Sequence, residues 1–210
     1  MIWPKPRRRD AAPERWLVLD VESSGLDASR DRLLALAAVA LHCDARRAGI
    51  DLADSFEVVL RQPAEAAAPD KANILVHGIG VGAQGSGMEA AEALRRFEAF
   101  AGDAPLLAFH AAFDKQLIDR AMQARLGRRL RHRWLDIADL AAVLRPGIAA
   151  RTLDDWLAAC AIPCLQRHNA AADTLATAEL LLHLLPAARA DGAVNFNGLA
   201  RLAKRRRWLK

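Results

Sequence analysis

Carboxylates fall at positions in this 210-residue chain where they could bind a metal. Asp20 and Glu22 lie two residues apart at the end of an apolar run, and this spacing puts both side chains on one face of a strand. Two like charges on one face repel, and a divalent cation relieves the repulsion because hard cations bind carboxylate oxygens. The pair alone is equally compatible with two solvated acids beyond the end of a strand.

Asp114 follows a short apolar segment and falls in the first turn of a predicted helix, where a negative charge is also favourable as a simple capping acid. His168 and Asp173 are five residues apart, so they do not share a helical face. The pair makes sense if His168 lies in a loop before the helix and Asp173 lies within it. Taken alone, each of these segments is also compatible with no site at all.

Taken together, the four carboxylates come from three separate elements, and His168 adds a group whose reference pKa of about 6.5 suits a general base. Four carboxylates around two Mg²⁺ or Mn²⁺ ions meet the requirement for in-line hydrolysis of a phosphodiester bond. The sequence therefore predicts a two-metal hydrolytic centre.

The elements that position these residues follow from the apolar pattern. Strands are expected at 16–21, 32–42, 56–61 and 106–109, with a short extended piece at 133–137. Helices are expected at 88–101, 113–126, 139–144, 152–161 and 170–185. Pro163 and Pro186 are expected to end the last two helices. Three strands followed by alternating helices and strands indicate an α/β domain with a mixed sheet.

The composition is that of a globular protein, with 53% hydrophobic and 26% charged residues. The longest uncharged apolar run, 33–41, is far shorter than the roughly 18 residues that a membrane span needs. No apolar segment of a secretory signal follows the basic N-terminus. Three cysteines argue against a disulfide framework. We therefore expect a cytoplasmic protein with no membrane partner.

Positive charge gathers at the two ends. Removing the ends from the totals of 30 Lys/Arg and 25 Asp/Glu leaves 19 basic and 23 acidic residues between 16 and 200. Residues 1–15 and 191–210 are therefore predicted to be basic tails flanking a catalytic domain at 16–190. Such tails suit a polyanion partner, and simple solvation explains them equally well. A second basic cluster, Arg125, Arg128, Arg129, Arg131 and Arg133, either guides a strand or is solvated.

Three segments resemble the motifs of the DEDD exonucleases. Residues 20–26 read DVESSGL, 110–114 read HAAFD and 168–173 read HNAAAD. They resemble the family patterns D-x-E-x-(T/S)-G-(L/F), H-N-x-x-F-D and H-x-A-x-x-D, in the same order, with the second segment one residue shorter than its pattern. Residues 76–79, VHGI, are similar to a further family segment. The likeness is to the histidine-bearing branch, which includes the DNA polymerase III epsilon proofreading subunit, ribonuclease T and oligoribonuclease.

The resemblance implies a ribonuclease H-like mixed β-sheet flanked by helices, and a 3′-5′ exonuclease acting on single-stranded nucleic acid, with DNA favoured. By this resemblance Asp20, Glu22, Asp114 and Asp173 hold the two metal ions, and His168 deprotonates the attacking water. The terminal nucleotide would be bound by Glu22, Ser23, Gly25, Leu26, His77 and Phe113.

Two departures affect how the nucleotide is held: Ala111 replaces the usual Asn, and Ser23-Ser24 replaces Thr-Thr. Two alternatives stay open at this point: a non-catalytic adaptor that binds a polymerase, and an oligoribonuclease-like enzyme. The spacing of Cys160, Cys164 and His168 imitates a zinc site, but Pro163 interrupts the helix between them, so we interpret both cysteines as small core residues. A DNA polymerase subunit is a candidate partner, and the oligomeric state is open.

Overall fold

The computed structural model describes residues 12–63, 74–75, 77–164 and 166–208. The strands are β1 (Glu14–Ser23), β2 (Leu33–Cys43), β3 (Ala48–Val59), β4 (Leu106–Ala108) and β5 (Trp134–Asp136). The helices are α2 (Val81–Ser86), α3 (Ala90–Ala101), α4 (Ala111–Leu126), α5 (Ile137–Leu144), α6 (Leu153–Ala159), α7 (Ala170–Ala190) and α8 (Phe196–Lys204). A 3-10 turn, η1 (Arg205–Trp208), follows α8.

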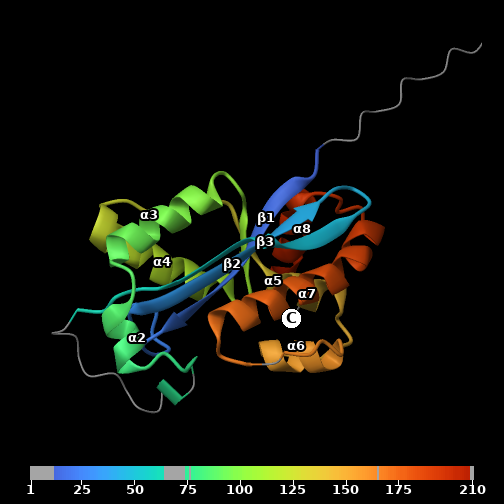
Figure 1. The fold of residues 1–210 in the computed structure, drawn as a ribbon. Helices are drawn as coiled ribbons and strands as arrows, with labels where there is room; N and C mark the ends of the chain where they lie inside the picture. Colours follow the sequence, from blue (N-terminus) through green and yellow to red (C-terminus); the bar gives the residue numbers. More distant parts are fainter. Residues whose placement is uncertain (1–11, 64–73, 76, 165, 209–210) are drawn as a thin grey trace, which may run out of the picture.

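One five-stranded sheet in the order β3-β2-β1-β4-β5 forms the middle layer, with helices on both faces (Figure 1). The first three strands are antiparallel neighbours, whereas β4 runs parallel to both β1 and β5. This mixed sheet confirms the predicted α/β class. It also makes β1 the central strand, in contact with strands on both sides.

Alternate residues of β1 enter two separate cores. Trp16 and Val18 pack with α5, α6, α7 and α8 on one face of the sheet. Leu17, Leu19 and Val21 pack with α3 and α4 on the other face. Asp20 and Glu22 continue the series of Trp16 and Val18, so β1 directs both carboxylates toward the α7 side. Val21, between the two acids, faces the opposite core.

Helix α7 continues past Pro186, where the sequence predicted its end. A proline inside a helix has no N–H and gives up one helical hydrogen bond. Burial offsets that loss, because Leu184, Leu185 and Ala188 around the proline all lie in the core. Strand β3 also differs from the prediction, since it begins at Ala48 rather than near residue 56.

The predicted C-terminal tail is wrong for the part that the structure describes. Residues 196–204 form α8, and Phe196, Leu199 and Leu202 are buried in the same core as α7. The amphipathic spacing of these apolar residues outweighs the surrounding arginines. The predicted N-terminal tail lies, up to residue 11, outside the described residues. Within the described segments, no helix is long and apolar enough to span a membrane.

Candidate active site

Three of the four predicted acids come together at the end of β1. Carboxylate oxygens of Asp20, Glu22 and Asp173 lie within 4.8 Å of one another. The first two come from β1, and Asp173 comes from the first turn of α7, which packs against the same face of the sheet. Among the described residues, this is the one cluster of acidic, histidine or cysteine side chains close enough to share a metal ion.

Asp114 reaches the site from the opposite layer. It lies in the first turn of α4, is only 3% exposed, and accepts hydrogen bonds from the backbone N–H groups of Val21 and of Asp114 itself. Its charge raises the pKa of Asp20, which places the two carboxylates within electrostatic reach. Asp114 does not join the group of three, because α4 packs on the Val21 side of β1.

The carboxylates at this end of the sheet hold more negative charge than their surroundings balance. Burial, and then the charges of Asp114, Glu22 and Asp173, raise the pKa of Asp20 well above its usual range. Burial and Asp173 raise the pKa of Glu22 from 4.5 to about 7. Burial raises the pKa of Asp114 to about 8, against the effect of its backbone hydrogen bonds. Converging, mutually repelling oxygen donors fit a hard divalent cation.

Arg167 is a residue that the sequence analysis missed. Its guanidinium forms an ion pair with Asp173 and another with the exposed Asp154. The arginine also lowers the pKa of Asp20 and Glu22, in opposition to burial. Arg167 therefore supplies part of the missing positive charge. No motif marks it in the sequence, because its effect depends on the fold bringing Asp154 beside α7.

His168 lies in the turn before α7, as the five-residue spacing from Asp173 predicted. It has a positive φ of 61°, and its backbone N–H donates a hydrogen bond to Asp173 Oδ2 at 3.0 Å. Asn169 then caps α7 by accepting from Ala172 N–H. The His168 side chain is exposed. The imidazole is therefore accessible to solvent, and the turn that carries it is hydrogen-bonded to Asp173 of the cluster.

The loop between β1 and β2 presents an apolar side chain next to the acids. Ser23 Oγ donates to the Gly25 carbonyl oxygen at 2.5 Å. A Cβ on Gly25 would lie 2.5 Å from the carboxylate of Asp31, so any other residue at position 25 would displace the Asp31 side chain. The next residue, Leu26, is 95% exposed. Such an exposed leucine is available to contact an apolar part of a ligand.

His77 and Phe113 are the other two predicted substrate-binding residues. His77 is buried, and its Nδ1 accepts the Ile79 N–H at 2.9 Å. Burial lowers the pKa of this histidine. A neutral ring whose Nδ1 accepts carries its proton on Nε2, and this atom is buried without a partner among the described residues. Phe113 is partly buried in the first turn of α4, and its role stays a prediction.

The zinc alternative finds no support in the described part of the chain. Cys160 follows the end of α6, so it shares no helical face with Cys164 or His168. Cys164 Sγ instead lies 3.6 Å from an Asp173 carboxylate oxygen as a hydrogen-bond donor. Burial raises the pKa of this thiol, which disfavours the thiolate that zinc needs.

Comparison with known proteins agrees with this geometry. The RNase T-type family model, described as exonuclease, matches residues 17–181. The chain belongs to this exonuclease family. A DNA polymerase III subunit epsilon-like protein of Rhodobacter capsulatus is 32% identical over 88% of this chain, and a PolC-type DNA polymerase III of Bacillus cereus is 30% identical over 83%. The chain spans only 25% and 12%, respectively, of these relatives.

Solved structures show the same fold. E. coli exonuclease I in complex with a dT13 oligonucleotide has a TM-score of 0.64 and 19% identity, with 82% of this chain and 40% of the other covered. Cell-death related nuclease 4 has a TM-score of 0.69 and 14% identity, with 82% and 64% covered. The predicted ribonuclease H-like fold is confirmed. Family membership supports a nuclease, and the acidic cluster supplies donors suited to divalent metal.

Proposed function

We propose that this protein is a metal-dependent 3′-5′ exonuclease that removes nucleotides from single-stranded nucleic acid, with DNA favoured. The observation that carries the proposal is the convergence of carboxylate oxygens of Asp20, Glu22 and Asp173 within 4.8 Å of one another. Burial and the neighbouring acids also raise the pKa values of Asp20 and Glu22. Unbalanced acids at the end of a central strand destabilise the metal-free fold. Metal-dependent catalysis accounts for keeping them.

In this proposal Asp20, Glu22, Asp114 and Asp173 hold two Mg²⁺ or Mn²⁺ ions. The bound ions would lower the pKa of the attacking water and stabilise charge on the attacking and leaving oxygens. Asp114, which comes from α4 on the other face of the sheet, would complete the set of four carboxylates. Arg167 balances part of the acidic charge through its ion pair with Asp173, and its second ion pair, with Asp154, holds the guanidinium beside the cluster.

His168 acts as the general base. Its imidazole is exposed, and the turn that carries it is tied to the cluster by the hydrogen bond from its N–H to Asp173. The histidine would take a proton from the attacking water, so that one O–H bond breaks as the new P–O bond forms. The P–O bond to the 3′ oxygen of the preceding nucleotide breaks in the same step, and that oxygen takes up a proton from solvent. A positioned base of this kind contributes roughly 10²–10⁴-fold to turnover.

The 3′-terminal nucleotide is bound by Glu22, Ser23, Gly25, Leu26, His77 and Phe113. Leu26 offers an apolar surface for the base, and its exposure in the free protein supports that use. The unpartnered Nε2–H of His77 offers a donor that an oxygen of the sugar or phosphate would satisfy. Glycine at position 25 keeps the backbone of this loop close to Asp31.

The test is a degradation assay on single-stranded DNA and RNA labelled at the 5′ end, with Mg²⁺, Mn²⁺ or EDTA. A 3′-5′ exonuclease shortens a 5′-labelled strand one nucleotide at a time, so a descending ladder should form only with metal. Immediate release of a labelled mononucleotide would reverse the polarity. No cleavage of any strand would favour the adaptor alternative, and cleavage limited to the shortest strands would favour the oligoribonuclease-like one.

The relatives are DNA polymerase III polypeptides, and this supports a polymerase subunit as partner. Residues 16–190, extended to include α8, form the exonuclease domain in this proposal, since α8 packs in the core of the α7 face.

A further inference from the structure

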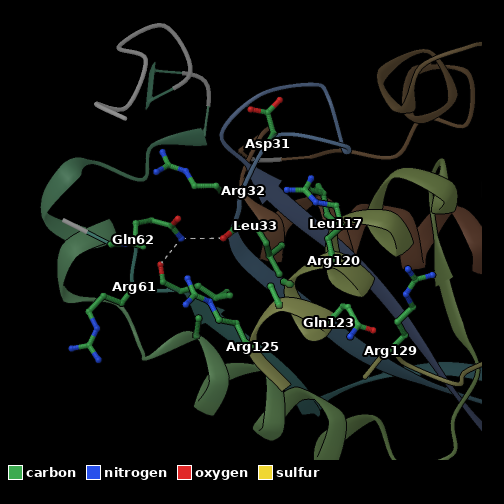
Figure 2. Close-up of a pocket in the computed structure, with 15 residues that line it drawn as sticks. Asp31, Arg32, Leu33, Arg61, Gln62, Leu117, Arg120, Gln123, Arg125 and Arg129 are labelled. Carbon is green, nitrogen blue, oxygen red and sulfur yellow. Dashed lines mark hydrogen bonds between the residues drawn. The ribbon is translucent and has the colours of Figure 1, made fainter. Parts of the chain in front are cut away.

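A groove lined by arginines lies between the start of β2, the end of β3 and helix α4 (Figure 2). Its volume is about 460 Å³, within the roughly 300–1,000 Å³ typical of ligand sites. Leu33, Leu60 and Leu117 give it an apolar floor. The arginines that line it are Arg32, Arg61, Arg120, Arg125 and Arg129.

Two of the charged residues in the groove, Asp31 and Arg120, already form hydrogen bonds within the protein. Asp31 accepts hydrogen bonds from Ser24 Oγ at 2.9 Å and from the backbone N–H of Asp27 at 2.8 Å. Arg120 donates to the carbonyl oxygens of Ala28 and Arg30. Both side chains therefore brace the β1–β2 loop. This loop carries Leu26, so one wall of the groove is built on the loop that flanks the acidic cluster.

Three other arginines remain available to a ligand. Arg61, Arg125 and Arg129 are exposed, and within the described residues none of them forms an ion pair. Their neighbours in sequence differ: Arg128 pairs with Glu98, and Arg133 donates to Asn197 Oδ1 and lies over the Phe196 ring. The basic cluster seen in the sequence thus divides. Arg125 and Arg129, which form no ion pair with the described residues, join Arg61, just beyond the end of β3, around one groove.

The groove is part of a longer basic surface. It shares Arg61 and Arg125 with a hollow of about 430 Å³ next to α2. It shares Arg129 with a hollow of about 670 Å³ beyond the C-terminal end of α4. A single phosphate would use only a fraction of this surface. Arginine binds phosphates and also stacks on bases, and the apolar floor suits bases too, so the chemistry fits an extended polyanion with aromatic groups.

We propose that this arginine groove binds the segment of a single-stranded nucleic acid that lies away from the 3′ end held at the acidic cluster. The identity of the strand rests on the proposed function. Contacts from Arg61, Arg125 and Arg129 to phosphates do not distinguish one base from another, so binding here is independent of base sequence. It also depends strongly on salt, because each neutralised phosphate releases counterions.

The test measures binding of 5′-labelled single-stranded DNA of about 20 nucleotides by fluorescence anisotropy in EDTA, over a series of salt concentrations. The variant is Arg125→Ala/Arg129→Ala, and Arg61→Ala probes the groove from the segment just after β3. The control, Arg46→Ala/Arg201→Ala, removes the same charge from exposed positions outside the groove. The double variant should reduce the slope of log K against log salt by about 1.4, since each phosphate contact on a single strand contributes about 0.7. The control should keep more of the wild-type slope.

An equal slope for the groove variants and the control would overturn the proposal. Hydrolysis of a strand of about three nucleotides, too short to reach the groove, tests the proposed function separately and should be unchanged in the groove variants. If the wild-type protein cleaves this short strand and the groove variants bind long strands as the wild type does, the groove proposal is wrong and the proposed nuclease function stands. If binding depends on the groove arginines but no strand is cleaved, the groove proposal stands and the proposed nuclease function is wrong. Melting temperatures equal to wild type show that the variants are folded.

Discussion

Acidic side chains at the two ends of strand β1 have opposite electrostatic environments. At the N-terminal end Asp54 accepts two hydrogen bonds from Arg15, at 2.6 and 2.7 Å, and the arginine holds the pKa of that carboxyl below its usual range. Glu14 accepts from Trp16 Nε1 and from the Phe196 N–H. At the C-terminal end Asp20 and Glu22 have pKa values raised by burial.

This difference separates carboxylates that stabilise the fold from carboxylates that are available for catalysis. A buried or half-buried acid without a matching cation costs free energy, whereas the Arg15–Asp54 pair contributes to stability. The same strand, in the same sheet, can satisfy its acids, as its first residues show. Leaving Asp20 and Glu22 unsatisfied is therefore a property of the site and not a limitation of the fold.

The largest effect is expected from substitutions of the acids at the C-terminal end of β1. Asp20→Asn keeps the size of the side chain but removes a metal ligand, so nuclease activity should fall at least roughly 10⁴-fold, corresponding to several kcal/mol of transition-state stabilisation. Glu22→Gln, Asp114→Asn and Asp173→Asn should be similarly inactive. Steady-state hydrolysis of labelled single-stranded DNA measures the loss.

Asp54→Asn is the matched control at the other end of β1. It should leave hydrolysis near the wild-type rate and lower the unfolding free energy by about 1 kcal/mol, through loss of a partly buried ion pair with Arg15. Chemical denaturation measures this change. An Asp20→Asn enzyme with wild-type turnover would remove that residue from the metal site.

His168→Ala should lower turnover by roughly 10²–10⁴-fold, the range for one positioned base. Metal affinity should change little, because the carboxylates remain. Activity should recover partly at high pH, where hydroxide replaces the base. His183→Ala, an exposed histidine on α7, is the control and should behave as wild type. A His168 variant that loses metal and regains nothing at high pH would contradict the general-base role.

Arg167→Ala removes the cation that pairs with Asp173 of the acidic cluster. Because Arg167 lowers the pKa of Asp20 and Glu22, its loss leaves the acids more strongly in need of a divalent ion. We expect Mn²⁺ affinity to rise by roughly 5–10-fold, as for a modest coupling between two cations. Arg95→Ala, on α3, is the control. Weaker Mn²⁺ binding by Arg167→Ala would mean that the arginine supports the site.

The smallest effect is a pH dependence of opposite sign at the two ends. Glu22 has a raised folded-state pKa, so its stabilising contribution is complete below about 4.5 and is lost as the pH rises through about 7. Asp54 has a lowered pKa, so its contribution is lost as the pH falls below 3.8. The melting temperature of the metal-free protein should therefore fall by a few degrees between pH 5 and pH 8.

Glu22→Gln should flatten this fall in melting temperature, and Glu57→Gln, an exposed acid on β3, should not. A wild-type protein whose melting temperature rises across the same range would show that the cluster is not strained by its charge.

Much of the arrangement of this site could be predicted from the sequence, because the spacing of residues along the chain determines which strand face or turn they occupy. The two-residue spacing of Asp20 and Glu22 fixed their shared face, and the five-residue spacing of His168 and Asp173 predicted a turn followed by a helix. Arg167 and its partner Asp154 could not be found in this way, since only tertiary packing brings them together. The separation of Asp114 from the other acids likewise depends on which face of the sheet α4 covers.

The errors in the fold have the same origin. Pro186 and the C-terminal arginines are strong local signals for a helix end and a solvated tail. Burial of Leu184, Leu185 and Leu202 outweighs them. A local pattern predicts an element well only where packing does not favour a different one.

Titration calorimetry of Mn²⁺ binding shows whether the acids at the C-terminal end of β1 form a metal site. The wild-type protein should bind the ion, and Asp20→Asn should weaken binding by at least about 100-fold, since even partners of metal ligands contribute 10–100-fold. Asp54→Asn should bind as the wild type does. Equal Mn²⁺ binding by wild type and Asp20→Asn would contradict the account, because the acids at the end of β1 would then not be a metal site.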